Sequence, residues 1–216
     1  MPEPKIRPAA FFSAPFLICA AVLLASGCAT LFGWDIHAPG VLSNRFYSRV
    51  LPQEQRIGLY LDPSLHGMIS TDRGGRFADP QTYHIGEAYV PMAIEAFQQG
   101  FTEFVLIESE PTQEMLRQYA IPYLVYIKPG DFGNDVTLKG QAVSFETEVF
   151  VFDRNLGFVD RFTTTGSSDA KKVFAKKGGP QVNLNAALEN NAESIALHIQ
   201  DALRSGRWVK NVSKTE

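Results

Sequence analysis

The sequence predicts a single α/β (α+β) domain, in which a mixed sheet of about five strands packs with two or three helices behind an N-terminal segment and tether. Three observations predict this fold class. Short apolar segments alternate with helical patterns along the first half of the domain, an order typical of α/β folds. A strictly alternating strand and its hairpin partner follow, which indicates antiparallel strands with one exposed face. A long amphipathic helix then ends the domain.

The first half of the domain is expected to have the order β-α-β-α-β. The strands are expected at residues 56–61, 104–107 and 123–127, and the helices at residues 88–100 and 111–119. The third strand is apolar throughout, which favours a central place in the sheet. Pro91 lacks a backbone N–H, so the first helix is expected to begin near Ala88 and to keep Pro91 in its first turn. Residues 62–80 are expected to form a long polar loop.

The second half is expected to hold a β-hairpin and the long helix. One face of the first hairpin strand carries Val143, Phe145, Thr147, Val149 and Val151, and the other carries Ser144, Glu146 and Glu148. This alternation predicts a half-exposed strand. Residues 153–157 have the composition of a turn, and residues 158–165 are expected to return as the partner strand. The helix is expected at residues 184–205, with Gly206 as its stop.

The N-terminus has the layout of a secretory signal peptide, because Lys5 and Arg7 precede an apolar run at residues 11–25. This run is shorter than the roughly 20 apolar residues that cross a membrane. It leads into Ala25, Ser26, Gly27 and Cys28. These four residues resemble the lipidation motif of bacterial lipoproteins. The resemblance implies that residues 1–27 are removed and that Cys28 carries a diacylglycerol and an N-acyl chain; the alternative is an unmodified cysteine beside an ordinary cleavage site.

This lipid anchor implies a protein of the cell envelope that is bound to the membrane. Ala29 rather than Asp follows the cysteine, which in lipoproteins favours onward transport to the outer membrane. The resemblance therefore implies that the protein is anchored in the outer membrane and faces the periplasm. Cys19 is lost with the signal and Cys28 is acylated, so we expect no free thiol, no disulfide and no cofactor besides the lipid. The chain carries 20 basic and 23 acidic residues, a net charge of −3, which disfavours nonspecific nucleic-acid binding.

Residues 28–55 are expected to form a lipidated tether, and residues 207–216 a C-terminal tail. Gly33, Pro39, Gly40 and Pro52 interrupt any regular period in the tether. It also contains four aromatic residues: Phe32, Trp34, Phe46 and Tyr47. Either these side chains pack back onto the domain or they form a contact strip for a partner or for the membrane interface.

The element order, together with the turn at residues 152–157 between two hairpin strands, resembles the small α/β domains of envelope lipoproteins such as the curli-secretion protein CsgG and the N-terminal domain of TolB. The resemblance covers residues 56–206. It implies the fold and, more weakly, a role in envelope transport or secretion.

The candidate chemistry is sparse. The four histidines have neither the i, i+4 spacing nor the cysteine partners of a usual zinc site, so no metal site is expected. His84 and Glu87 form a conceivable acid–base pair, but Glu87 is better explained as an acidic residue at a helix N-terminus. No nucleophile elbow or phosphate-binding loop is present in the sequence. We therefore expect no catalytic residues and no enzyme activity.

One basic cluster is a candidate contact with anionic groups. It consists of Lys171, Lys172, Lys176 and Lys177. In an envelope protein such a cluster suits anionic headgroups, lipopolysaccharide phosphates or an acidic partner, and the alternative is a solvated face.

The sequence thus favours a non-enzymatic, lipid-anchored accessory subunit of an envelope transport, secretion or cell-wall assembly system, with a protein partner in the envelope and no nucleic acid. The alternative is an oligomeric secretion-channel subunit resembling CsgG. Residues 143–152 alone approach the length of a barrel strand, which counts against that alternative.

Overall fold

The computed structural model describes residues 33–72, 80–137, 140–168 and 179–208. The expected mixed sheet is confirmed and has five strands in the order β5-β2-β6-β7-β8. A second sheet, with the order β1-β4-β3, adds three short strands. Five helices are present in the described ranges, against the two or three expected from the sequence.

The large sheet changes from parallel to antiparallel at β6, as the sequence pattern predicts. Its strands are β2 (Gln53–Leu61), β5 (Phe101–Ile107), β6 (Tyr123–Thr137), β7 (Gly140–Asp153) and β8 (Phe158–Ser167). Strand β2 pairs in parallel with both β5 and β6, whereas β6–β7 and β7–β8 are antiparallel. The expected turn after β7 is confirmed, because the Asp153 carboxylate accepts hydrogen bonds from the backbone N–H groups of Asn155 and Gly157, both at 2.8 Å.

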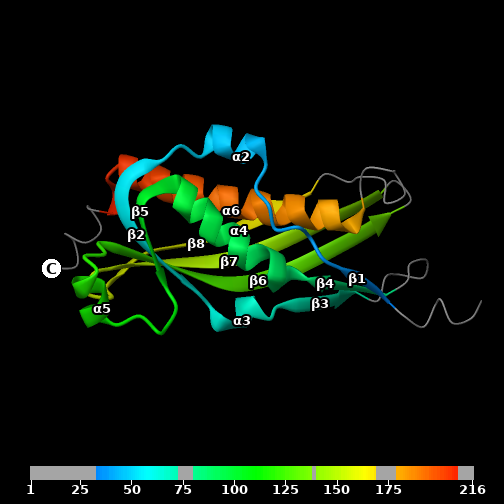
Figure 1. Cartoon of the computed structure of the whole chain (residues 1–216), viewed down its shortest axis with the longest axis horizontal. Coiled ribbons are helices and arrows are strands. Elements are labelled where there is room, and N and C mark those ends of the chain that lie inside the picture. Colours follow the sequence, from blue (N-terminus) through cyan, green and yellow to red (C-terminus); the bar gives the residue numbers. More distant parts are fainter. Residues whose placement is uncertain (1–32, 73–79, 138–139, 169–178, 209–216) are drawn as a thin grey trace, which may run out of the picture.

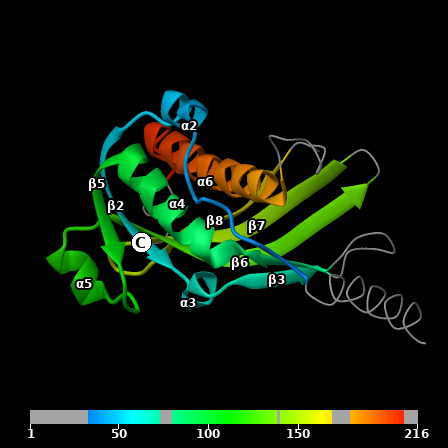
Figure 2. The ribbon, with the colours of Figure 1, turned by 45° about the vertical axis from the view of Figure 1, so that its right-hand side comes forward.

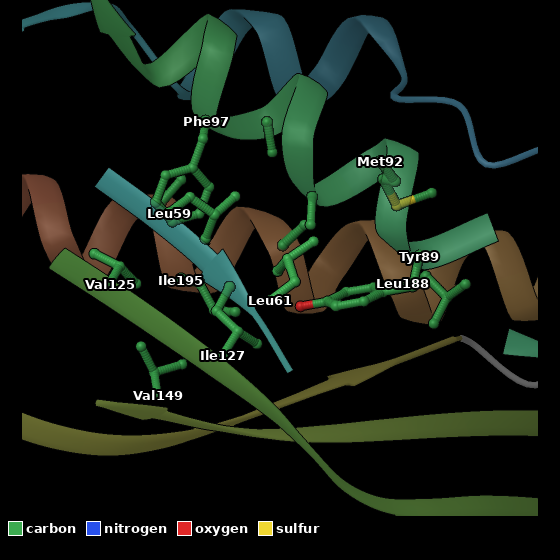
Figure 3. Packing of buried hydrophobic residues seen from close by; sticks show 14 of the residues in the cluster. Leu59, Leu61, Tyr89, Met92, Phe97, Val125, Ile127, Val149, Leu188 and Ile195 are labelled. Atoms are coloured by element: carbon green, nitrogen blue, oxygen red, sulfur yellow. The ribbon is translucent and has the colours of Figure 1, made fainter. Parts of the chain in front are cut away.

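Helices cover one face of this sheet, as Figures 1 and 2 show. They are α4 (Ile85–Gly100) and α6 (Pro180–Arg204), with the short α2 (Asn44–Arg49) outside them. The core lies between these helices and the sheet, where the labelled side chains of Figure 3 meet. The strands contribute Leu59, Leu61, Val125, Ile127 and Val149, and the helices contribute Tyr89, Met92, Phe97, Leu188 and Ile195. Each such side chain stabilises the fold by roughly 1.5–3 kcal/mol relative to an exposed one.

The opposite face of the sheet is covered at one end by α5 (Gln113–Gln118). A small second cluster lies there, formed by Ile107, Leu116, Ile121 and Leu124. Thr112 is the N-cap of α5, and its side-chain oxygen accepts a hydrogen bond from the Met115 N–H at 3.2 Å. This N-cap replaces an otherwise missing acceptor in the first turn.

The predicted polar loop at residues 62–80 is wrong in part, because it contains regular structure. It includes α3 (Pro63–His66) and β3 (Ile69–Asp72), and β4 (Gln81–His84) follows it directly. Strand β4 pairs antiparallel with β3 and parallel with β1 (Trp34–Ile36). These strands have three or four residues each, too short to give a clear sequence period.

Helix α4 begins at Ile85 rather than near Ala88, so Pro91 lies inside the helix and not in its first turn. The N-terminal turn is fixed by close packing at Gly86, where a Cβ atom would lie 2.0 Å from the Leu65 carbonyl oxygen. The Gly86 N–H also donates a hydrogen bond to the Met68 carbonyl at 3.0 Å. Tertiary contact at this glycine therefore moves the helix start ahead of the position that proline chemistry predicts.

The predicted boundaries of the domain differ from those of the structure at both ends. Residues 33–55, predicted as tether, hold β1, α2 and the first residues of β2, and the side chain of Phe46 is fully buried. The alternative in which these aromatics pack onto the domain is therefore confirmed for Phe46, whereas Trp34 remains half exposed. At the other end, Trp208 is buried in the core although it was predicted to lie in the tail.

Candidate functional site

The predicted lipidation and basic residues lie outside the described part of the chain. They are Ala25, Ser26, Gly27, Cys28, Lys171, Lys172, Lys176 and Lys177. Their roles stay predictions from the sequence.

A row of aromatic side chains crosses the sheet face that lies opposite α4 and α6. Strand register places Tyr60 of β2 beside Tyr126 of β6, Tyr126 beside Phe150 of β7, and Phe150 beside Arg161 of β8. The ring centroids of Tyr60 and Tyr126 are 5.1 Å apart, and those of Tyr126 and Phe150 are 6.1 Å apart. We call these four residues the aromatic ladder.

Cations lie over the rings of the aromatic ladder. The Lys128 Nζ atom is 5.2 Å from the Tyr126 centroid and 5.4 Å from that of Phe150. The Arg161 guanidinium carbon lies 5.2 Å from the Phe150 centroid, and the same guanidinium pairs with Glu148. These distances are those of cation–π contacts. Positively charged groups therefore lie against the aromatic rings of the ladder.

Asp62 borders the ladder and is fixed by hydrogen bonds from two hydroxyl groups. Its carboxylate accepts from the Tyr126 hydroxyl and from the Ser64 hydroxyl and backbone N–H. Burial alone would raise the pKa of Asp62, but the hydrogen bonds from Ser64 and Tyr126 outweigh it and hold that pKa below its ordinary value. Burial, and then the bond to Asp62, raise the pKa of Tyr126, so its phenol stays protonated at neutral pH.

The rings of the ladder are only partly buried. Tyr60, Tyr126 and Phe150 are half-buried. Phe158, with 62% of its surface exposed, lies next to Phe152, whose ring stacks beside that of Phe150. The cluster beneath α5 contacts Tyr60 and leaves the centre of the ladder partly open. Aromatic residues and arginine are the types that carry most binding energy in protein interfaces. The ladder is therefore a candidate docking surface.

Sequence reasoning identified the polar face of β7 but missed the ladder. The alternation of β7 predicts that Glu146 and Glu148 share a half-exposed face, and the burial pattern of the strand confirms this. Phe150 continues the same face, but only the register of β2, β6 and β8 brings its aromatic and basic neighbours beside it. A search for alternate aromatic residues in adjacent predicted strands would have found Tyr60 and Tyr126.

A second group of polar side chains, here called the histidine cluster, lies where β1 and β4 end beside α4. It consists of Asp35, His37, His84 and Glu87. The rings of His37 and His84 stack with centroids 4.0 Å apart and an interplanar angle of 14°. His37 Nδ1 lies 2.8 Å from Glu87 Oε2, and His84 Nε2 lies 3.7 Å from Asp35 Oδ1.

The sequence identified His84 and Glu87 as neighbours but did not find His37. The parallel pairing of β1 with β4 sets Ile36 beside Tyr83, so the next residue on each strand is a histidine. Glu87 does lie in the first turn of α4, as predicted. Its contact with His37 depends on β1, a strand within the segment that was predicted to be a tether.

Two surface hollows in the described ranges each contain a single acidic residue. One, of about 680 Å³, is lined by Gln113, Glu114, Arg117 and Gln118 on one side of α5. The other, of about 330 Å³, lies between β6, β7 and the end of β8 and has Asp135 as its single acidic residue. None of the described helices has both the length and the apolarity to cross a bilayer.

Comparison with known proteins gives distant similarities of structure. No family model matches the chain, and no curated protein matches it. The solved structure of protein CT253 from Chlamydia trachomatis has a TM-score of 0.41 at 8% identity and covers 70% of this chain and 96% of its own. The PelC dodecamer from Paraburkholderia phytofirmans gives 0.37 at 10% identity, with 66% and 86% covered.

Lipoprotein GNA1162 from Neisseria meningitidis gives a TM-score of 0.33 at 6% identity and covers 69% of this chain and 99% of its own. Similarities at these scores carry no argument about the function of this chain. The resemblance to CsgG and TolB stays a prediction from the sequence.

Proposed function

We propose that this protein is a lipid-anchored, non-enzymatic accessory subunit of the bacterial cell envelope, which docks onto a protein partner through the aromatic ladder. The ladder is the observation that carries the proposal. It places Tyr126, Phe150 and Arg161 side by side on a face whose rings remain partly exposed. Such side chains are enriched at the energetic centre of interfaces.

The charges around the ladder define the chemistry of the partner. Lys128 and Arg161 both lie over its rings, while the carboxylates of Glu148 and Asp62 already accept from groups of this chain. A partner surface that presents apolar side chains with acidic residues between them complements this arrangement. The proposed partner is therefore a protein whose contact surface combines apolar side chains, aromatic or aliphatic, with acidic residues.

The lipidation motif supports a position close to the membrane. Residues 29–32 alone separate Cys28 from Gly33, where the described structure begins. Even fully extended, this stretch spans roughly 18 Å. With Cys28 acylated, the folded domain would stay near the lipid surface, where a partner in the same membrane is within reach.

A site-specific crosslinking experiment tests the docking surface. A photoreactive amino acid replaces Phe158 at the edge of the ladder, and in a control protein it replaces Ser194 on the exposed side of α6. We expect a discrete protein adduct from the Phe158 position. Adding Phe150→Ala is expected to abolish this adduct, whereas adding Thr163→Ala, on β8 like Phe158 itself, is expected to leave it unchanged. An equal adduct from Ser194, or one that Phe150→Ala leaves unchanged, would contradict the docking surface.

Intact-mass analysis with membrane fractionation tests the anchor. The mature wild-type protein is expected in the membrane fraction with three acyl chains at Cys28. Cys28→Ser is expected to be soluble and folded, because position 28 lies ahead of every residue of the core. A wild-type chain cleaved at another residue and lacking acyl groups would refute the anchor and leave the crosslinking result to stand alone.

A further inference from the structure

We propose that the histidine cluster binds a divalent transition-metal ion, with Zn²⁺ as the ligand of choice, through His37, His84 and Glu87. One ligand atom from each of these residues lies within 4.8 Å of the other two. Among the described residues, these are the histidine and acidic side chains whose ligand atoms come close enough together to hold a metal ion. The site is independent of the aromatic ladder and of the proposed docking function.

The three side chains lie close enough together to share a metal ion after side-chain rotation. Tetrahedral zinc ligands at about 2.1 Å from the metal lie roughly 3.4 Å from one another. His37 Nδ1 and Glu87 Oε2 are 2.8 Å apart, slightly closer than this value. The ligand atoms of all three residues lie within 4.8 Å of one another. Because the two imidazole rings are stacked, with an interplanar angle of 14°, a shared ion requires rotation about their χ angles so that one nitrogen of each ring points toward it.

The backbone already holds the three side chains in position. His37 follows β1 directly, His84 is the last residue of β4, and Glu87 lies in the first turn of α4. The β1–β4 pairing fixes the two histidines side by side. Ligands on paired strands and a helix lose little conformational freedom when they bind, which favours a preformed site.

The charge of the cluster also suits a divalent cation. Two neutral imidazoles with the carboxylates of Glu87 and Asp35 carry a charge of about −2, which balances a divalent ion. Asp35 Oδ1 lies 3.7 Å from His84 Nε2 and adds its negative charge beside the three ligands. The carboxylates also offset the unfavourable effect of the α4 N-terminus on a nearby cation.

The donor set selects the class of metal. Imidazole nitrogen with carboxylate oxygen suits Zn²⁺ and its neighbours in the transition series, whereas Mg²⁺ and Ca²⁺ prefer oxygen alone. His37 and Glu87 are more than half exposed at their side chains, so a bound ion would keep contact with solvent. Such an ion leaves a coordination position open to water or to a group from another molecule.

Isothermal titration of the full chain with ZnCl₂ tests the proposal. The protein is purified in detergent without a histidine tag and stripped with a chelator. We expect one Zn²⁺ per chain and a melting temperature that rises with zinc, because the ion binds the folded state. Excess Mg²⁺ is expected to leave the zinc affinity unchanged.

Three variants and one matched control complete the experiment. His37→Ala and His84→Ala are each expected to weaken zinc binding by at least about tenfold, because loss of a direct ligand costs no less than loss of a supporting group. Glu87→Gln keeps the side-chain shape and is expected to weaken binding as well, so it decides the matter if a histidine variant fails to fold. His66→Ala, at the exposed end of α3, is expected to bind as the wild type does.

The absence of saturable binding to the wild type would overturn the proposal. Equal affinity in the wild type and in His37→Ala or Glu87→Gln would overturn it too. In either case the contacts of His37 serve only to hold β1 against α4.

Discussion

Asp62 combines two structural roles at the scale of a single residue. It is the N-cap of α3, where its carboxylate accepts from the Ser64 backbone N–H at 3.0 Å, and it also accepts from the Tyr126 hydroxyl on the neighbouring strand. Both sets of bonds favour the ionised carboxylate and lower its pKa, against the effect of partial burial. Asp62 thus links α3 to the aromatic ladder.

The Tyr126→Phe substitution is expected to raise the pKa of Asp62 toward its ordinary value, because one hydrogen bond to the ionised form is lost. A lowered pKa contributes stability that is present above the unfolded-state value of about 3.9 and is lost as the pH falls through the folded-state value. The variant should therefore show a weaker loss of stability in acid. A carbon-detected NMR titration of the Asp62 carboxyl measures the shift, with Tyr60→Phe as the control on the same ladder. An identical Asp62 titration in the wild type and Tyr126→Phe would contradict the assigned hydrogen bond.

At the scale of elements, predictability follows the strength of the local pattern. The hairpin strands and α6 are long and periodic, and each of their predicted ends lies within a few residues of the observed end. Strands β1, β3 and β4 are short and exist through pairing with one another, which no local pattern records. The histidine cluster depends on β1 and was missed for the same reason. The aromatic ladder was missed because it needs the register of four strands.

The packing of α6 on β8 depends on one glycine, and this contact gives a prediction. A Cβ atom at Gly166 would lie 2.0 Å from the Ala187 carbonyl oxygen and 2.3 Å from the Asn191 backbone nitrogen, both within the helix. Gly166→Ala must therefore push strand and helix apart, and we expect a loss of about 3 kcal/mol or more in the free energy of unfolding. Urea unfolding followed by circular dichroism measures it.

Gly67→Ala is the matched control for this change, because no atom lies within 4 Å of a Cβ at that position. It is expected to change the free energy of unfolding by less than about 1 kcal/mol. The separation of the strand from α6 would also disturb Asn191, which is fully buried and bonds to the Tyr89 hydroxyl at 2.7 Å and to the Thr164 carbonyl at 3.0 Å. Equal stability of the two glycine variants would show that the helix and strand adjust freely.

At the scale of the whole molecule, the N-terminal segment belongs to the folded body. Phe46 and Val50 are fully buried, and Glu193 of α6, itself buried, pairs with Arg45 and Arg49 around α2. Glycines and prolines interrupt any regular period in this segment, so its docking could not be read from local periodicity. Its position matters for function because it carries β1, and β1 brings His37 to the histidine cluster.

The docking of this segment predicts a large effect for Phe46→Ala. The side chain is fully buried in the main core, and removal of a buried phenylalanine costs about 3–5 kcal/mol. Tyr47→Ala on the next residue removes a ring that is 37% exposed and is expected to cost less than half as much. Thermal unfolding of both variants in the Cys28→Ser background, which avoids detergent, measures the difference.

If residues 33–55 were a solvated tether, both variants would unfold at the wild-type temperature, and a fragment that begins at Gln53 would be as stable as the full chain. The structure predicts instead that this fragment is strongly destabilised, because it lacks β1 and α2 and leaves the surface beneath Phe46 open to water.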